Sequence, residues 1–101
     1  MAVVEPGAPE STTVHLHGDI DVGNASAIGD ELIELIASGS THVVVVCSSI
    51  TFVESRGLAM MARVQRFADD AGCRLSWHAL PLDVLHSIHV TGLDRYLHIE
   101  A

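Results

Sequence analysis

Apolar and polar residues alternate along residues 13–18, where Val14 and Leu16 share one side of the chain. A period of two residues predicts a strand with one buried face. Along residues 25–36 the apolar residues instead recur at helical spacing, and Asn24 before them is expected to cap the helix through its side-chain oxygen. The first part of the chain therefore predicts a strand followed by a helix.

The same two patterns recur in the middle of the chain. Residues 42–47 contain four consecutive valines, which favours a central strand covered on both faces. A second helix is expected over residues 57–71, with Val64 and Phe67 on its apolar stripe. Residues 74–78 alternate again and predict another strand with one buried face.

The last third of the chain predicts a third helix that begins at Pro81, because proline suits a first helical turn. Leu82, Leu85 and His89 mark its expected inner side, and a last short strand or turn runs through residues 96–99. Strands that alternate with helices predict right-handed crossovers and a mostly parallel sheet. The expected fold is a small α/β domain with a four- to five-stranded sheet and three to four helices.

The 101 residues are expected to form one domain. Residues 12–101 are assigned to it, whereas residues 1–11 are interpreted either as a flexible N-terminus or as a short edge strand. No secretory signal is visible, and no apolar run approaches the ~20 residues that a membrane span needs. We therefore expect a cytoplasmic protein without direct membrane insertion, and the choice between a monomer and a weak dimer stays open.

The charge balance argues against nucleic acid as a partner. The chain has 13 Asp and Glu against 5 Lys and Arg, which gives a formal net charge of -8. Proteins that bind DNA or RNA use basic patches to displace counterions from phosphates. The five basic residues are all arginines, and they are scattered along the sequence: Arg56, Arg63, Arg66, Arg74 and Arg95.

No residue pattern predicts an enzyme, a metal site or a cofactor. The sequence lacks a Gly-x-Ser-x-Gly elbow and a glycine-rich phosphate loop. His15 and His17 share one strand face and His42 could lie nearby, but a third metal ligand is not evident, and solvent-facing histidines are the favoured interpretation. Cys47 and Cys73 are placed at opposite ends of adjacent strands, so we expect two reduced, buried thiols.

Three short motifs follow one another along the chain. They are Gly18-Asp19-Ile20-Asp21, Phe52-Val53-Glu54-Ser55-Arg56-Gly57-Leu58 and Thr91-Gly92-Leu93. In this order and on these elements they resemble the signatures of the STAS domain, in particular those of the bacterial anti-sigma-factor antagonists. The resemblance covers roughly residues 12–99.

The resemblance implies partner switching. In that family the unphosphorylated antagonist binds an anti-sigma factor, often itself a serine kinase, and so frees a sigma factor. Phosphorylation of the second serine of the middle motif abolishes binding, because a phosphate brings about -1.5 to -2 charges into a packed interface. The expected partner is therefore an anti-sigma factor of the serine-kinase type. The alternative is a STAS subunit of a membrane transport complex, such as a lipid ABC system, that docks on its ATPase.

The chain departs from the family at the phosphoacceptor. Arg56 occupies that position and has no hydroxyl, while Glu54 and Val46 stand where the family usually has aspartates. Three interpretations stay open, of which we favour the first: loss of the switch with constitutive binding, Ser55 as a displaced acceptor, or a different partner. Ser55 also qualifies as a helix N-cap, and Arg56 as a surface cation paired with Glu54 or Asp21.

The motifs are expected to meet at one edge of the sheet, because the loops that leave the carboxyl ends of parallel strands lie together. The exposed side of the second helix continues this surface. The expected partner-binding face consists of Asp19, Asp21, Asn24, Glu54, Ser55, Arg56, Gly57, Arg63 and Arg66.

Overall fold

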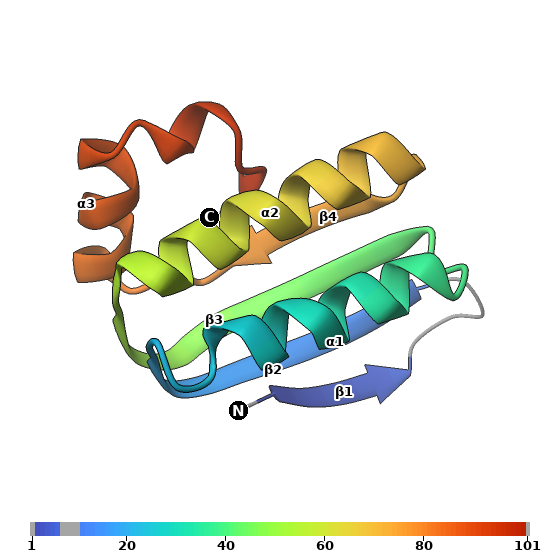
Figure 1. The fold of residues 1–101 in the computed structure, drawn as a ribbon, viewed down its shortest axis with the longest axis horizontal. Coiled ribbons are helices and arrows are strands. Elements are labelled where there is room, and N and C mark those ends of the chain that lie inside the picture. Colours follow the sequence, from blue (N-terminus) through green and yellow to red (C-terminus); the bar gives the residue numbers. More distant parts are fainter. Residues whose placement is uncertain (1, 7–10, 101) are drawn as a thin grey trace.

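The computed structural model describes residues 2–6 and 11–100 (Figure 1). In chain order its elements are β1 (Ala2–Pro6), β2 (Ser11–Ile20), α1 (Ala25–Ala37), β3 (His42–Val53), α2 (Ser55–Ala71), β4 (Arg74–His78), α3 (Leu82–Val90), the 3-10 helix η1 (Leu93–Arg95) and β5 (Ile99–Glu100). The strands form one sheet in the order β1-β2-β3-β4-β5, in which β1 is antiparallel and the other four strands are parallel. The predicted α/β fold with a mostly parallel sheet is confirmed.

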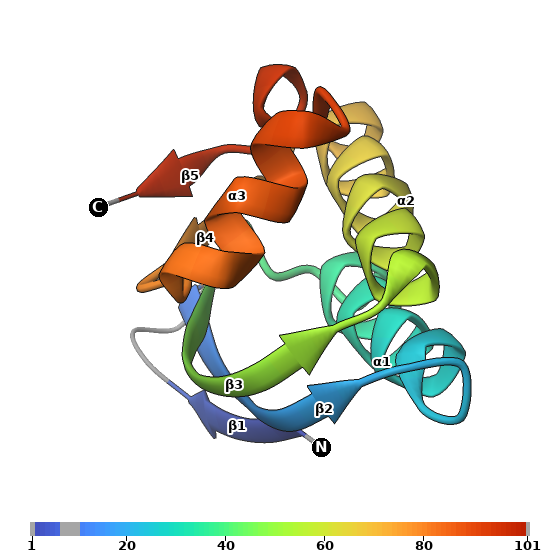
Figure 2. The same cartoon turned by 90° about the vertical axis from the view of Figure 1, so that its left-hand side faces the viewer.

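Helices α1 and α2 lie side by side on one face of the sheet, and α3 lies at the carboxyl ends of β3 and β4 (Figures 1 and 2). Along β3 the burial therefore alternates: Val43 and Val45 are fully buried, whereas Val44 and Val46 are half-buried. The expectation of a strand covered on both faces was wrong, because α1 and α2 pack on the same side.

Strands β2 and β3 are longer than the sequence pattern indicated. They pair in parallel from Ser11 opposite His42 to Ile20 opposite Val53, with irregular register on both sides of Gly18. Residues expected to form loops after short strands thus continue the sheet. Their pairing brings the first two motifs to neighbouring strand ends.

The buried sides of two helices differ from the predicted stripes. On α2 Val64 is fully buried, but Phe67 is 37% exposed because the buried stripe continues through Ala68. Helix α3 begins one residue after Pro81, and its buried residues are Val84 and Ile88. The expected inner positions Leu82 and His89 are exposed, and Leu85 is half-buried. The buried side of each helix is set by the elements against which it packs, which the local sequence pattern does not specify.

A buried polar network joins α2 to β4 and to the segment before β5. The side chain of Gln65 is 2% exposed, and its Oε1 accepts hydrogen bonds from Trp77 Nε1 at 3.0 Å and from the backbone N–H of His98 at 3.2 Å. Its Nε2 donates to Asp69 Oδ1 at 3.0 Å. The network satisfies the indole N–H of the fully buried Trp77, which would otherwise be costly to bury.

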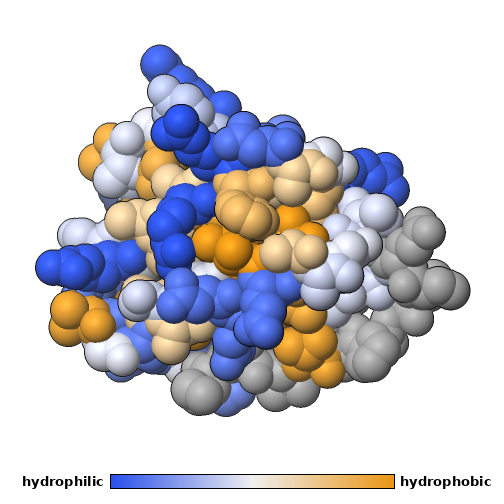
Figure 3. Space-filling view, turned by 45° about the vertical axis from the view of Figure 1, so that its right-hand side comes forward, coloured by the Kyte–Doolittle hydropathy of each residue, from blue (hydrophilic) through white to orange (hydrophobic). Residues whose placement is uncertain are grey.

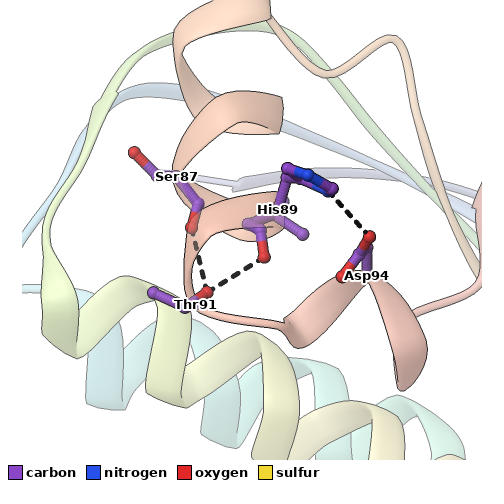
Figure 4. A network of polar contacts seen from close by, with 5 residues as sticks. Ser87, His89, Thr91 and Asp94 are labelled. Carbon is purple, nitrogen blue, oxygen red and sulfur yellow. Dashed lines mark hydrogen bonds and ion pairs between the residues drawn. The ribbon is translucent and has the colours of Figure 1, made fainter.

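The third motif ends α3 (Figure 4). The Thr91 hydroxyl donates to the carbonyl oxygens of Ser87 and Ile88, at 2.9 and 3.0 Å. Gly92 follows with φ +78°, a left-handed conformation that glycine adopts at little cost. The chain then turns into η1. There Asp94 Oδ2 lies 3.1 Å from Nδ1 of His89, which is on α3. In this structure the motif ends a helix and reverses the chain.

The two cysteines are buried free thiols. Burial raises the pKa of the Cys47 thiol to about 12. It also raises the pKa of Cys73, where a backbone hydrogen bond at Val43 acts in the opposite direction. Among the described residues, no helix has the length and apolar character that crossing a membrane requires.

Candidate functional site

The loop between β2 and α1 is held by its own polar side chains. Asn24 Oδ1 accepts a hydrogen bond from the Asp21 backbone N–H at 2.9 Å, and Asn24 Nδ2 donates to the Asp19 carbonyl at 2.8 Å. The backbone N–H of Gly23 donates to Asp21 Oδ1 at 2.9 Å. The expectation that the Asn24 side chain caps α1 was wrong, because both ends of its amide bind the preceding loop.

The second motif makes the turn from β3 into α2. Glu54 donates its backbone N–H to the Ile20 carbonyl at 2.9 Å, and its own carbonyl accepts from Gly57 and Leu58 at 2.8 and 3.1 Å. Glu54 is therefore the N-cap, without a side-chain capping bond, and Ser55 is already the first helical residue. The expectation of Ser55 as the N-cap was off by one residue.

Gly57 is required by the close approach of α2 to the strand ends. A Cβ atom at this position would lie 2.6 Å from Val53 Cγ1 and 2.9 Å from Ile20 Cγ2. Side-chain atoms do not approach so closely without a shift of the neighbouring structure. The packing at Gly57 thereby fixes the position of the two preceding residues relative to β2 and β3.

Two hollows flank the start of α2, and Figure 2 looks onto this edge of the molecule. The first, between α1 and α2, measures about 260 Å³ and is lined by Val22, Ala25, Ser26, Arg56, Ala59, Met60 and Arg63. The second, between α2 and α3, measures about 490 Å³ and is lined by Phe52, Val53, Glu54, Ser55, Leu58, His86, Ser87, Val90 and Thr91.

Consecutive residues Ser55 and Arg56 therefore belong to different surfaces. Successive side chains on an α-helix are rotated by roughly 100° about its axis. Arg56 lines the hollow shared with α1, and Ser55 lines the hollow shared with α3. A group attached to Ser55 would not occupy the place of the Arg56 side chain.

Arg56 is exposed, and it has no hydrogen bond or ion pair within the part of the chain that the structure describes. The expected pairing with Glu54 or Asp21 is not formed: the Asp21 carboxylate accepts from the loop backbone. The other carboxylate of that motif, Asp19, accepts from Thr51 Oγ1 at 2.6 Å. Arg56 thus projects from a fixed backbone without an internal partner.

The other two arginines of the expected face lie further along α2. Arg63 Nη2 is 3.3 Å from Asp30 Oδ1 on α1, and the two side chains are 47% and 70% exposed. Such an exposed pair contributes little to stability. Arg66 is exposed as well but does not line either hollow at the start of α2.

The structure thus brings most of the expected face together. The residues gathered at the carboxyl edge are Asp19, Asp21, Asn24, Glu54, Ser55, Arg56 and Gly57. Arg63 joins them through the α1–α2 hollow, whereas Arg66 lies beyond it along α2.

The sequence reasoning missed the apolar part of this edge. Val22, Phe52 and Val90 are 65%, 55% and 69% exposed, and each lines one of the two hollows. Val22 stands between polar residues of a loop, which is a weak signal because single exposed apolar residues are common. A partner that covered these three side chains would bury apolar area at the centre of a polar edge.

Another hollow, of about 500 Å³, lies between β1 and α1 and is lined by Val4, Glu31, Glu34, Leu35 and Ser38. Figure 3 turns the molecule toward the side away from the motif edge, where hydrophilic side chains surround smaller apolar areas. None of the motif residues lines the β1–α1 hollow, so it is separate from the candidate site.

The site offers polar contacts more than reactive chemistry. Across residues 2–6 and 11–100, no three His, Cys, Asp or Glu side chains form a group that could hold a metal ion. The Ser55 hydroxyl has no hydrogen bond to a histidine or carboxylate among the same residues, although Glu54 and His86 line the same hollow. An exposed, rigidly held edge with unpaired polar groups is suited to binding another molecule.

Comparison with known proteins identifies a family whose model matches this chain. A family model described as "Mlab, STAS domain" matches residues 4–99. No curated protein matches the chain.

The fold is similar to that of solved anti-sigma factor antagonists. One from Mycobacterium paratuberculosis is 23% identical with a TM-score of 0.84, over 98% of this chain and 83% of that one. SpoIIAA in its unphosphorylated form is 17% identical with a TM-score of 0.82, over 100% and 89% of the two chains. The murine Solute Carrier 26 family member A9 anion transporter is 15% identical with a TM-score of 0.74, over 89% of this chain but 16% of the transporter.

Proposed function

Because the chain belongs to the STAS domain family, we propose that it is an anti-sigma-factor-antagonist-like regulator that binds an anti-sigma factor of the serine-kinase type. The observation that carries this proposal is the rigid edge at which the first two motifs meet and expose Ser55 and Arg56. The likeness to solved anti-sigma factor antagonists supports it. In this proposal the protein acts in the cytoplasm, needs no cofactor and catalyses no reaction.

The proposed contact surface combines the β2–α1 loop with the start and the exposed side of α2. Hydrogen bonds within the loop and the packing of Gly57 hold it in one shape, so little conformational entropy is lost on binding. Its proposed contact residues are Asp19, Asp21, Asn24, Glu54, Ser55, Arg56, Gly57, Arg63 and Arg66.

We further propose that binding is constitutive with respect to phosphorylation at the family's acceptor position. Arg56 has no hydroxyl to accept a phosphate. A phosphate on Ser55 would enter the hollow beside α3 and lie next to the carboxylate of Glu54. That displaced acceptor is the weaker interpretation, because its charge would stand on a different surface from Arg56.

The test is affinity capture with the wild-type chain, followed by titration of the captured anti-sigma factor after its purification. We expect the wild type and Arg56→Ser to bind it, and Arg56→Glu to bind at least about tenfold more weakly because the charge is reversed inside the contact. Failure of the wild type to bind any anti-sigma factor would contradict the proposed function.

Incubation of the same proteins with the partner kinase and ATP tests the absence of the switch. We expect phosphate to enter Arg56→Ser, which restores a hydroxyl at the acceptor position, and to weaken its binding. The wild type should stay unlabelled and keep its affinity. Label on the wild type that disappears in Ser55→Ala would instead establish the displaced acceptor.

A second candidate is a STAS subunit that docks on the ATPase of a membrane transport complex, such as a lipid ABC system. The likeness to a part of the Solute Carrier 26 family member A9 anion transporter favours keeping it, since that protein is a transporter. The affinity capture separates the two candidates: an ABC ATPase bound at the motif edge in place of an anti-sigma factor would establish the second.

A further inference from the structure

The exposed side of α2 has a local charge opposite to that of the whole chain. Three of the five arginines, Arg56, Arg63 and Arg66, lie on this helix, in a chain whose formal net charge is -8. From Ser55 to Ala68 the helix carries no acidic residue. A protein with so few basic residues therefore presents several of them on one helix at its motif edge.

Arg56 and Arg63 share one hollow, which gives these charges a defined geometry. They are seven residues apart, roughly 10 Å along the helix axis, and both line the hollow between α1 and α2. Apart from Ser26, the rest of the lining is apolar: Ala59 and Met60 on α2, Ala25 on α1 and the 65% exposed Val22 on the facing loop.

Neither arginine is neutralised by a strong internal ion pair. Arg56 has no partner among the described residues, and Arg63 reaches only the exposed Asp30 at 3.3 Å. Two carboxylates of the motif edge are engaged elsewhere, Asp19 with Thr51 and Asp21 with Gly23, and the third, Glu54, lines the hollow beside α3. The Arg56 guanidinium is thus free to form a bidentate bond with an incoming carboxylate, and Arg63 would exchange its exposed pair with Asp30 for a second one.

We propose that the α1–α2 hollow binds an acidic segment of a partner protein, whose carboxylates pair with Arg56 and Arg63 while an apolar side chain covers Val22. This inference deepens the proposed function, because it names the chemistry that the partner must present at the same edge. Charge complementarity selects an acidic occupant, and the apolar wall selects a peptide segment over a small free anion.

The experiment uses two synthetic helical peptides of equal length with a central leucine. One carries glutamates seven residues apart, and its control carries glutamines there. Each is titrated into the ¹⁵N-labelled full chain, and amide shifts and the Kd are recorded. The variants are Arg56→Gln/Arg63→Gln and the matched control Arg74→Gln, since Arg74 is exposed on β4 outside the hollow.

We expect the glutamate peptide to bind the wild type at least about tenfold more tightly than the glutamine peptide at low salt. The shifts should map to residues 22–26 and 56–63, and the difference should shrink as salt screens the charges. It should disappear in the double variant and persist in Arg74→Gln. Equal binding of both peptides, shifts elsewhere, or preference for anionic phosphatidylglycerol vesicles over the peptide would overturn the proposal.

A second arm separates this inference from the proposed function. If the captured anti-sigma factor binds the wild type and the double variant equally, the inference fails and the proposed function stands. If no anti-sigma factor binds but the glutamate peptide still occupies the hollow, the inference stands and the proposed function fails.

Discussion

Helix α2 carries polar side chains in both halves of its length, and their surroundings differ. In the second half Gln65 is 2% exposed and binds Trp77, His98 and Asp69. In the first turn Ser55 and Arg56 are exposed and have no such partners within the described residues. A polar group that is partnered inside the molecule contributes to stability, whereas one held outward by a rigid backbone remains available for recognition.

The largest expected effect comes from a substitution at Gln65, in the buried part of α2. Gln65→Leu removes the acceptor of the Trp77 indole and of the His98 backbone N–H, so we expect the free energy of unfolding to fall by about 2 to 4 kcal/mol. Urea denaturation followed by far-UV circular dichroism measures it. Partner affinity should not change under conditions in which the variant is folded.

Gln65→Leu combined with Trp77→Phe is the control, because it removes the indole donor together with its acceptor. We expect the double variant to lose less stability than the sum of the losses measured for Gln65→Leu and Trp77→Phe separately. Strict additivity would show that the Gln65–Trp77 hydrogen bond is not the stabilising element.

The start of α2 is tested by Gly57→Ala. The new methyl group would meet Val53 and Ile20, so we expect a loss of about 1 to 3 kcal/mol and a weaker partner complex, because the turn that positions Arg56 must move. Thermal unfolding and titration with the partner measure the two effects. The matched control is Gly72→Ala at the far end of α2, where a Cβ would meet nothing within 4 Å although φ is +74°. It should cost stability through backbone strain and leave binding intact.

The burial of the Cys47 thiol predicts that the free energy of unfolding falls at alkaline pH. The Cys47 thiol ionises near pH 9.0 in the unfolded chain but only near pH 12 when buried, so rising pH favours the unfolded state. Below pH 9.0 this thiol does not lower the free energy of unfolding. Between these two pH values the free energy of unfolding should fall by about 1 kcal/mol per pH unit. Urea titrations at several pH values measure it, and Cys47→Ala should show a flatter slope. An equal slope in both proteins would mean that the interior is open to water.

The smallest expected effect concerns Arg56, in the exposed first turn of α2. Arg56→Ala should change the free energy of unfolding by no more than about 0.5 kcal/mol, because the side chain is exposed and unpaired. Calorimetric melting of the two proteins measures it. A loss of more than about 1 kcal/mol would show that Arg56 supports the fold and would weaken its assignment to recognition.

Several features of this protein follow from the sequence alone, because they depend on local patterns. The alternation of strand and helix periods predicts the mostly parallel α/β fold, and Arg74–His78 coincides with its predicted strand. Three motifs in order indicate the STAS family before any contact is known. The loss of the usual acceptor needs no structure either, since an arginine has no hydroxyl.

Other features depend on which distant residues the tertiary structure brings together. The pairing of β2 with β3 decides that Glu54 binds Ile20 and that Gly57 must lack a side chain. The sides on which α1 and α3 pack decide that Ser55 and Arg56 face different hollows. Local periodicity carries the period of an element but not its rotation against neighbours, because that rotation is set by contacts between residues far apart in the chain.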